Sequence, residues 1–99
     1  MVEKNPNDVM VWYGLANEYL KQEQFAEAVE ALRQTLRLNP DYTAAYQMLG
    51  SALQNLGDEA EAVRIWQEGI ETANRTGAWK ARQHMESLLN QTKSGGFCS

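Results

Sequence analysis

Few side chains in this sequence could take part in catalysis, and they lie far apart. His84 is the single histidine and Cys98 the single cysteine. No carboxylate or thiol stands at a catalytic spacing from His84, and no neighbouring base would activate the Cys98 thiol. Asp58, Glu59 and Glu61 could hold a cation, but acidic residues in a first helical turn favour the helix dipole. We therefore expect no enzymatic activity, no metal site and no bound cofactor.

Composition narrows the classes of partner. The 99 residues carry a net charge of −4, the opposite sign to the cationic surface that nucleic-acid binding requires. An acidic surface also disfavours anionic lipid, and no apolar run is long enough to cross a membrane. One cysteine cannot form an intramolecular disulfide, which is typical of a reducing compartment. We expect a cytoplasmic protein that binds neither nucleic acid nor membrane.

The clearest pattern is an internal repeat of 34 residues. At this offset Asn5-Pro6 coincides with Asn39-Pro40, and the run at residues 26–29 coincides with the identical run at 60–63. Other coincident positions hold similar side chains, such as Trp12 with Tyr46. Helix-breaking Asn-Pro pairs and apolar residues that recur at the same offset indicate two copies of a single structural unit.

Each copy reads as two amphipathic helices. Apolar residues recur at spacings of three and four, which places them on one face of a helix. Asn7 or Asp8 can cap the first helix, and proline at position 40 ends the second. Gly57-Asp58 predicts a turn, since glycine adopts positive φ and aspartate caps the helix that follows. The predicted helices span residues 8–22, 25–38, 42–56 and 59–74.

Small residues recur at positions where two helices would approach closely. Ala16 and Gly50 coincide at the 34-residue offset, and so do Ala28 and Ala62. A bulky side chain at these positions would separate the helices of each hairpin. The coincidence predicts that Ala16 and Gly50 pack opposite Ala28 and Ala62.

Together these residues resemble the tetratricopeptide repeat family. Its pattern is W-x2-L-G-x2-Y, followed by an alanine, a large apolar residue, a small residue and a proline. The first repeat supplies Trp12, Leu15, Ala16, Tyr19, Ala28, Leu32, Thr35 and Pro40. The second supplies Tyr46, Leu49, Gly50, Leu53, Ala62, Trp66 and Gly69, with Asn74 departing from the expected proline.

The resemblance implies an all-α fold, a right-handed stack of two antiparallel helix-turn-helix repeats forming an alpha-alpha superhelix with a capping helix. We expect a single domain over residues 1–93, with repeats at 7–40 and 41–74 and the cap at 77–92. Residues 94–99 have no helical pattern, and we expect them to form a flexible tail. Ser94-Gly95-Gly96 precedes no helix and so predicts no phosphate loop.

Continuing the 34-residue register makes the third unit a cap. The positions of Trp12, Leu15, Ala16 and Tyr19 then carry the polar residues Lys80, Gln83, His84 and Ser87. An apolar stripe remains beside them and can cover the open end of the second repeat. We expect Trp79, next to that stripe, to pack under the preceding hairpin.

In this family the first helices of successive hairpins line a concave groove. The resemblance therefore implies a peptide-binding groove, with Tyr13 as an aromatic anchor and amides that bind a peptide backbone. Arg82 contributes from the cap. The predicted groove residues are Met10, Tyr13, Asn17, Leu20, Lys21, Gln47, Ser51, Gln54, Asn55 and Arg82.

Some family members bind a partner's C-terminal carboxylate through lysine, asparagine and arginine side chains. Asn17 and Arg82 match two of those positions, whereas Tyr13, Met48 and Ala78 replace the other three. The resemblance thus implies a protein or peptide partner without implying binding to chaperone tails.

Charge is unevenly distributed along the chain. Residues 41–74 hold one Arg and six acidic residues, and residues 75–99 hold four Lys or Arg and one acidic residue. Opposite charges could drive head-to-tail association. We expect a non-catalytic interaction module or adaptor, with a self-associating, weakly homodimeric repeat unit as the alternative.

Overall fold

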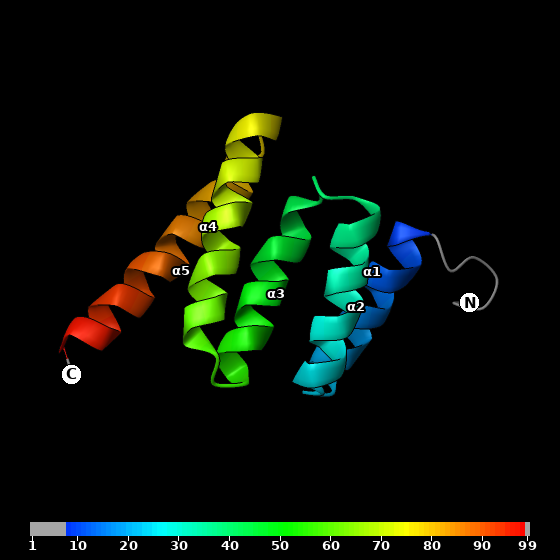
Figure 1. The fold of residues 1–99 in the computed structure, drawn as a ribbon, viewed down its shortest axis with the longest axis horizontal. Helices are drawn as coiled ribbons and strands as arrows, with labels where there is room; N and C mark the ends of the chain where they lie inside the picture. Colours follow the sequence, from blue (N-terminus) through cyan, green and yellow to red (C-terminus); the bar gives the residue numbers. More distant parts are fainter. Residues whose placement is uncertain (1–7, 99) are drawn as a thin grey trace.

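Five helices build the described part of the chain, and that part contains no strand. The computed structural model describes residues 8–98, with side chains described for residues 8–91. Successive helices run antiparallel and stand side by side along the long axis (Figure 1). The helices are α1 (Val9–Lys21), α2 (Phe25–Leu38), α3 (Thr43–Asn55), α4 (Glu59–Thr76) and α5 (Trp79–Cys98).

The boundaries of α1, α2 and α3 follow the sequence signals closely. The Asp8 carboxylate caps α1, because its Oδ1 accepts a hydrogen bond from the backbone N–H of Met10 at 3.0 Å. The alternative cap, Asn7, lies outside the described residues. Gly57 has φ 88° and Asp58 accepts a hydrogen bond from the N–H of Glu61 at 3.3 Å. The predicted turn at these two residues is confirmed.

The fourth helix is longer than the repeat register predicts. We expected it to end near Asn74, but α4 continues to Thr76 because no proline stands there to stop it. Gly77, at φ 83°, ends the helix instead, and α5 begins at Trp79. The starts of α1 and α3 are 34 residues apart, whereas those of α3 and α5 are 36 apart. The repeat register therefore shifts by two residues at α5.

This shift corrects the predicted alignment of the capping helix. Met85, fully buried, takes the place that Leu49 holds in α3, and Ala81 takes that of Ala45. The Met85 side chain packs on α4 beside Gly69. Lys80 and Gln83, which we aligned with core positions, instead align with exposed or half-buried positions and are exposed themselves. The 34-residue register was wrong here, although α5 does cover the open side of the second hairpin.

The end of α5 also differs from expectation. We predicted a cap ending near residue 92 and a non-helical tail over 94–99, but α5 continues to Cys98. Residues 92–98 contain no proline, and a glycine within a helix raises the free energy by only about 1 kcal/mol relative to alanine. The prediction of a non-helical tail was therefore wrong as far as Cys98, and residue 99 lies outside the described chain.

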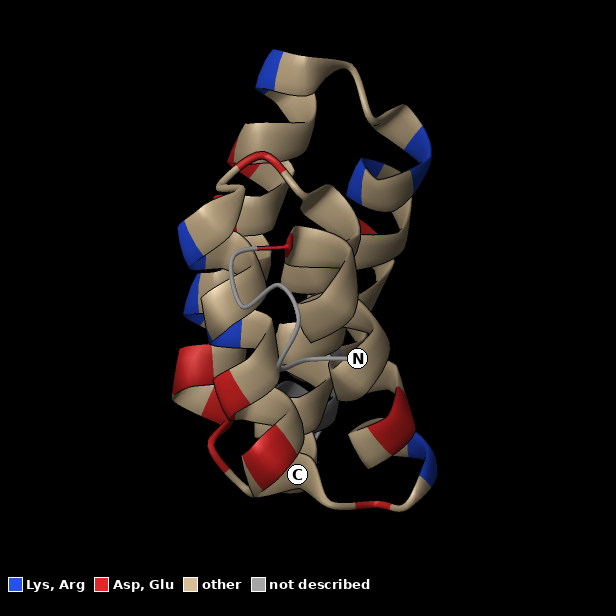
Figure 2. Cartoon of the chain, turned by 90° about the vertical axis from the view of Figure 1, so that its right-hand side faces the viewer, with Lys and Arg blue, Asp and Glu red and all other residues tan. Residues whose placement is uncertain are grey.

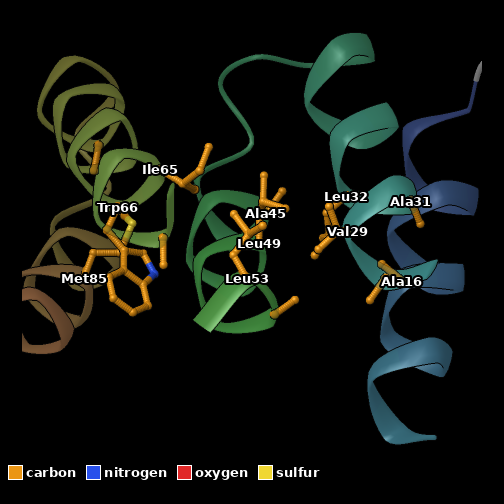
Figure 3. Close-up of a cluster of buried hydrophobic side chains, with 14 residues drawn as sticks. Ala16, Val29, Ala31, Leu32, Ala45, Leu49, Leu53, Ile65, Trp66 and Met85 are labelled. Carbon is orange, nitrogen blue, oxygen red and sulfur yellow. The ribbon is translucent and has the colours of Figure 1, made fainter. Parts of the chain in front are cut away.

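The hydrophobic core lies between successive helices and extends along the whole stack. Figure 3 shows Leu32 and Val29 of α2 facing α3, with Trp66 and Met85 at the other end, where α4 meets α5. The predicted small residues Ala16, Ala28 and Ala62 are each 0% exposed. Gly50 is buried against the Trp66 indole, whose Nε1 donates to the Gln47 carbonyl at 3.2 Å. Small side chains thus allow close packing within each hairpin.

Candidate protein-binding surface

An aromatic and thioether cluster joins the two repeats at the start of α1 and α3. The rings of Tyr13 and Tyr42 are tilted at 39° with centroids 4.8 Å apart. The Tyr42 hydroxyl donates to the Met10 sulfur at 3.6 Å. The Met10 side chain is one of the most exposed large apolar groups, at 59%. Two predicted groove residues, Met10 and Tyr13, are therefore brought together through Tyr42.

Tyr42 was not among the predicted groove residues, although it is the first residue of the helix predicted over residues 42–56. Tyr42 immediately precedes α3, and its half-buried ring reaches back to α1. Burial raises the pKa of the Tyr42 phenol, and its proximity to Tyr13 raises it further. The hydroxyl acts as a hydrogen-bond donor to the Met10 sulfur. An aromatic residue just before a repeat helix was the available signal.

Two predicted amide residues orient along their own helices. The Asn17 side-chain nitrogen donates to the Tyr13 carbonyl at 3.2 Å, and that of Asn55 donates to the Ser51 carbonyl at 2.9 Å. These bonds fix each carboxamide plane and leave its oxygen available to accept a hydrogen bond from a ligand. Such acceptors suit the N–H groups of an extended peptide.

Other predicted residues on α1 and α3 differ in their availability. Leu20 packs partly against the core, and the exposed Lys21 ammonium lies 3.8 Å from the Glu18 carboxylate. Gln47 is half-buried, with its backbone carbonyl engaged by Trp66, and Gln54 is also half-buried. The polar residues of this group therefore offer a ligand less exposed polar surface than the repeat pattern predicted.

Arg82 is the predicted residue least suited to a groove role. Its Nη1 donates to the Asn74 side-chain oxygen at 3.1 Å, which directs the guanidinium toward the end of α4. Its Nε is buried without a hydrogen-bond partner among the described residues. The two-residue shift aligns Arg82 with the core position of Tyr46, and this explains its inward orientation.

A hollow lies on the exposed side of α5. It is shallow and open, and its lining residues are Trp79, Lys80, Gln83 and His84. The expectation that Trp79 packs under the preceding hairpin was wrong, because this side chain is 58% exposed. In the shifted register, Lys80 and Gln83 align with Ala44 and Gln47 of α3, so the hollow continues the predicted groove positions onto α5.

No group of three or more potential metal-ligating side chains occurs in the described part of the chain. None of the described helices combines the length and the apolar character needed to cross a membrane. What the described surface does offer is exposed apolar side chains beside fixed amides, which is chemistry suited to contact with another chain.

Comparisons with known proteins agree with this architecture. The sequence profile described as tetratricopeptide repeat matches residues 4–78. A TPR repeat-containing protein of Pseudomonas aeruginosa is 31% identical over 91 residues, covering 92% of this chain and 87% of the relative. A Bordetella parapertussis protein of known solution structure has a TM-score of 0.86 at 27% identity, over 96% of this chain and 83% of that one. A tetratricopeptide repeat domain protein from Salinibacter ruber has a TM-score of 0.81 at 25% identity, over 88% and 97%.

Proposed function

This chain belongs to the tetratricopeptide repeat family, and on that premise we propose that it is a non-catalytic interaction module in the cytoplasm. Proteins of this family generally mediate contacts between proteins. In the proposal, α1 and α3 together bind an extended segment of a partner protein, as an adaptor would. The observation that carries the proposal is the cluster of Met10, Tyr13 and Tyr42, which spans both repeats.

The cluster has the physical character of an interface anchor. Aromatic side chains lose little conformational entropy on binding and bury a large apolar area. The contact between Tyr13 and Tyr42 restrains both rings before a partner arrives. Met10, unbranched and polarisable, can adapt to the shape of an incoming side chain.

The amides on the same helices complement this apolar anchor. The carboxamide oxygens of Asn17 and Asn55 can accept hydrogen bonds from a peptide backbone. Backbone contacts would provide affinity, and packing against the Tyr13 and Tyr42 rings would select the side chain. Specificity for one partner would then depend mainly on the cluster.

Affinity capture from an extract of the native cell tests this proposal. The double variant Tyr13→Ala with Asn17→Ala should lose the partner retained by the wild type. The control Glu30→Ala with Gln67→Ala alters exposed residues of α2 and α4 and should retain it. Circular dichroism would verify that both variants fold. Equal capture by both double variants would reject the assignment to α1 and α3.

Self-association is a second candidate, favoured by apolar residues exposed at both ends of the stack. Met10 lies on α1 at one end and Trp79 on α5 at the other, each more than half exposed (Figure 1). A head-to-tail contact would cover both, and the net positive charge of residues 75–99 would be attracted to the acidic remainder of a second copy. Sedimentation at micromolar concentration separates the two functions. A dimer that high salt dissociates supports self-association, and a monomer at all salt concentrations supports the adaptor.

A further inference from the structure

The exposed side of α5 carries a side chain that repeat packing does not require. Trp79 occupies the position that Thr43 holds in α3 and Val9 in α1, where neither helix needs an indole. With 58% of its surface exposed, Trp79 leaves a large apolar ring in contact with water. Rings of this kind that also line a hollow are typical of contact surfaces.

A cation stands beside the Trp79 ring. The Lys80 ammonium lies 5.8 Å from the ring centroid, within the range of a cation–π contact. Across the described part of the chain, Lys80 has no ion pair, whereas Lys21 pairs with Glu18 and Arg75 with Asp41. The three N–H donors of Lys80 are therefore available to an anionic group.

Gln83 and His84 complete the hollow one turn further along α5. Both are exposed and add an amide and an imidazole beside the ammonium. Over residues 79–91 of α5, whose side chains are described, Lys80 and Arg82 are the positively charged residues and Glu86 is the acidic one. Figure 2 shows Lys and Arg where α4 passes into α5 at the top, with much of the acidic ribbon in the lower half.

We infer that the Trp79 hollow binds an acidic segment of the partner protein, one that presents a side-chain carboxylate next to an aromatic or aliphatic side chain. The carboxylate binds the Lys80 ammonium, and the apolar side chain packs on the exposed face of the Trp79 indole. This inference rests on the proposed function, because the shifted register makes the hollow an extension of the same surface. It specifies the charge and side-chain type of the partner segment, which the surface on α1 and α3 does not determine.

Blocked synthetic peptides can test the inference on the full chain. The probe alternates aspartate and phenylalanine, and the matched control alternates asparagine and phenylalanine. Blocked ends remove the terminal carboxylate, so any charge effect comes from side chains. Nitrogen–proton NMR spectra follow the indole N–H of Trp79, assigned with Trp79→Phe. The buried indole of Trp66, bonded to the Gln47 carbonyl, is the internal reference.

The acidic probe should shift the Trp79 indole and the backbone amides of residues 79–84 in a saturable manner. Lys80→Gln should weaken this binding about tenfold, as expected when one charge-assisted hydrogen bond is lost. Arg37→Gln removes the same charge from the exposed side of α2, outside the proposed binding surface, and should leave the affinity unchanged. Lys80 and Arg37 are both exposed, so neither substitution should alter the fold.

Other outcomes would overturn the inference. Equal binding of the asparagine control would show that the carboxylate is irrelevant. A Trp79 signal that shifts with protein concentration alone would identify a second copy of this chain as the occupant. Shifts at Tyr13 without shifts at Trp79 would leave the proposed function standing and remove only the hollow. Shifts at Trp79 without shifts at Tyr13 would support the hollow and remove the assignment to α1.

Discussion

The two hairpins solve the same packing problem with different pairs of side chains. In the first, Ala16 on α1 and Leu32 on α2 are both fully buried. At the equivalent positions of the second, Gly50 on α3 lies against the Trp66 indole of α4. A Cβ built on Gly50 would stand 2.1 Å from the indole nitrogen of Trp66, far inside any van der Waals contact. The larger residue on one helix of the second hairpin is therefore matched by a smaller residue opposite it.

The turns of the two hairpins also share one backbone geometry but use different residues. Both place one residue in the left-handed region, at φ 59° for Glu23 and 88° for Gly57. The following N–H groups make equivalent bonds, from Gln24 to the Tyr19 carbonyl at 2.8 Å and from Asp58 to the Leu53 carbonyl at 2.9 Å. The left-handed position holds glycine in the second hairpin, where positive φ costs little, and glutamate in the first, where positive φ is unfavourable.

Among the substitutions proposed here, Gly50→Ala should have the largest effect on stability, because it disrupts packing in the second hairpin. The clash with Trp66 should lower the free energy of unfolding by about 1–3 kcal/mol, despite alanine's better helix propensity. Adding Trp66→Leu recreates the pair of the first hairpin and should recover about 1 kcal/mol or more relative to additivity. Urea unfolding of both single variants and the double variant measures this coupling. Strictly additive effects would contradict the paired-volume explanation.

Substituting the residue at the left-handed position of each turn should change the free energy of unfolding less, and with opposite sign in the two hairpins. Glu23→Gly relieves a side chain held at positive φ and should raise the free energy of unfolding by about 0.5–1 kcal/mol. Gly57→Ala imposes the same strain and should lower it by about 1 kcal/mol. Thermal and urea unfolding would check both. Changes of the same sign would show that the two turns are not equivalent.

The side-chain caps of α2 and α4 should have an effect no larger than that of the turn residues. Asp58 accepts a hydrogen bond from the N–H of Glu61, whereas Gln24 makes no side-chain cap bond to α2. Gln24→Asp should stabilise the protein by about 0.5–1 kcal/mol, and Asp58→Ala should destabilise it by a similar amount. Urea midpoints measured side by side would reveal the difference. No gain from Gln24→Asp would mean that the α2 start cannot accept a cap.

The smallest effect is expected from the ion pairs of the second hairpin. Hydrogen bonding to Arg64 lowers the pKa of the Glu61 carboxyl below 4.5, and the charges of Arg64 and Arg33 lower it further. A lowered folded pKa gives stability that is present above the ordinary value and lost as pH falls through the lowered one. Glu61→Gln should slightly reduce the acid sensitivity of urea unfolding, and Glu71→Gln on the same helix is the control. An unchanged pH profile for Glu61→Gln would remove this contribution.

Much of the fold could be predicted from the residues, because several boundaries of the first four helices carry local signals. Asp8, Pro40 and the Gly57-Asp58 pair define boundaries locally. The position of α5 could not be predicted, because it depends on where α4 ends. Without a proline, α4 continues to Gly77, and the register beyond it shifts.

The candidate surface was predicted less completely for a related reason. Met10, Tyr13 and Asn17 follow from the repeat positions, and their binding role stays a prediction. Tyr42 lies at the N-cap of α3, at the edge of the predicted helix, and the repeat pattern assigned it no groove position. Trp79 was expected to pack under the preceding hairpin because it stands next to the apolar stripe of the cap, but its side chain is exposed.

Site-specific photo-crosslinking tests the central claim most directly, namely that a partner segment lies across α1 and α3. A benzophenone side chain would replace Tyr13 in one variant and the exposed Gln67 of α4 in another. We predict that the Tyr13 variant forms a discrete crosslinked product in native extract, which excess unmodified protein suppresses, and that the Gln67 variant does not. Equal crosslinking from both positions, or a product from Gln67 alone, would contradict the claim.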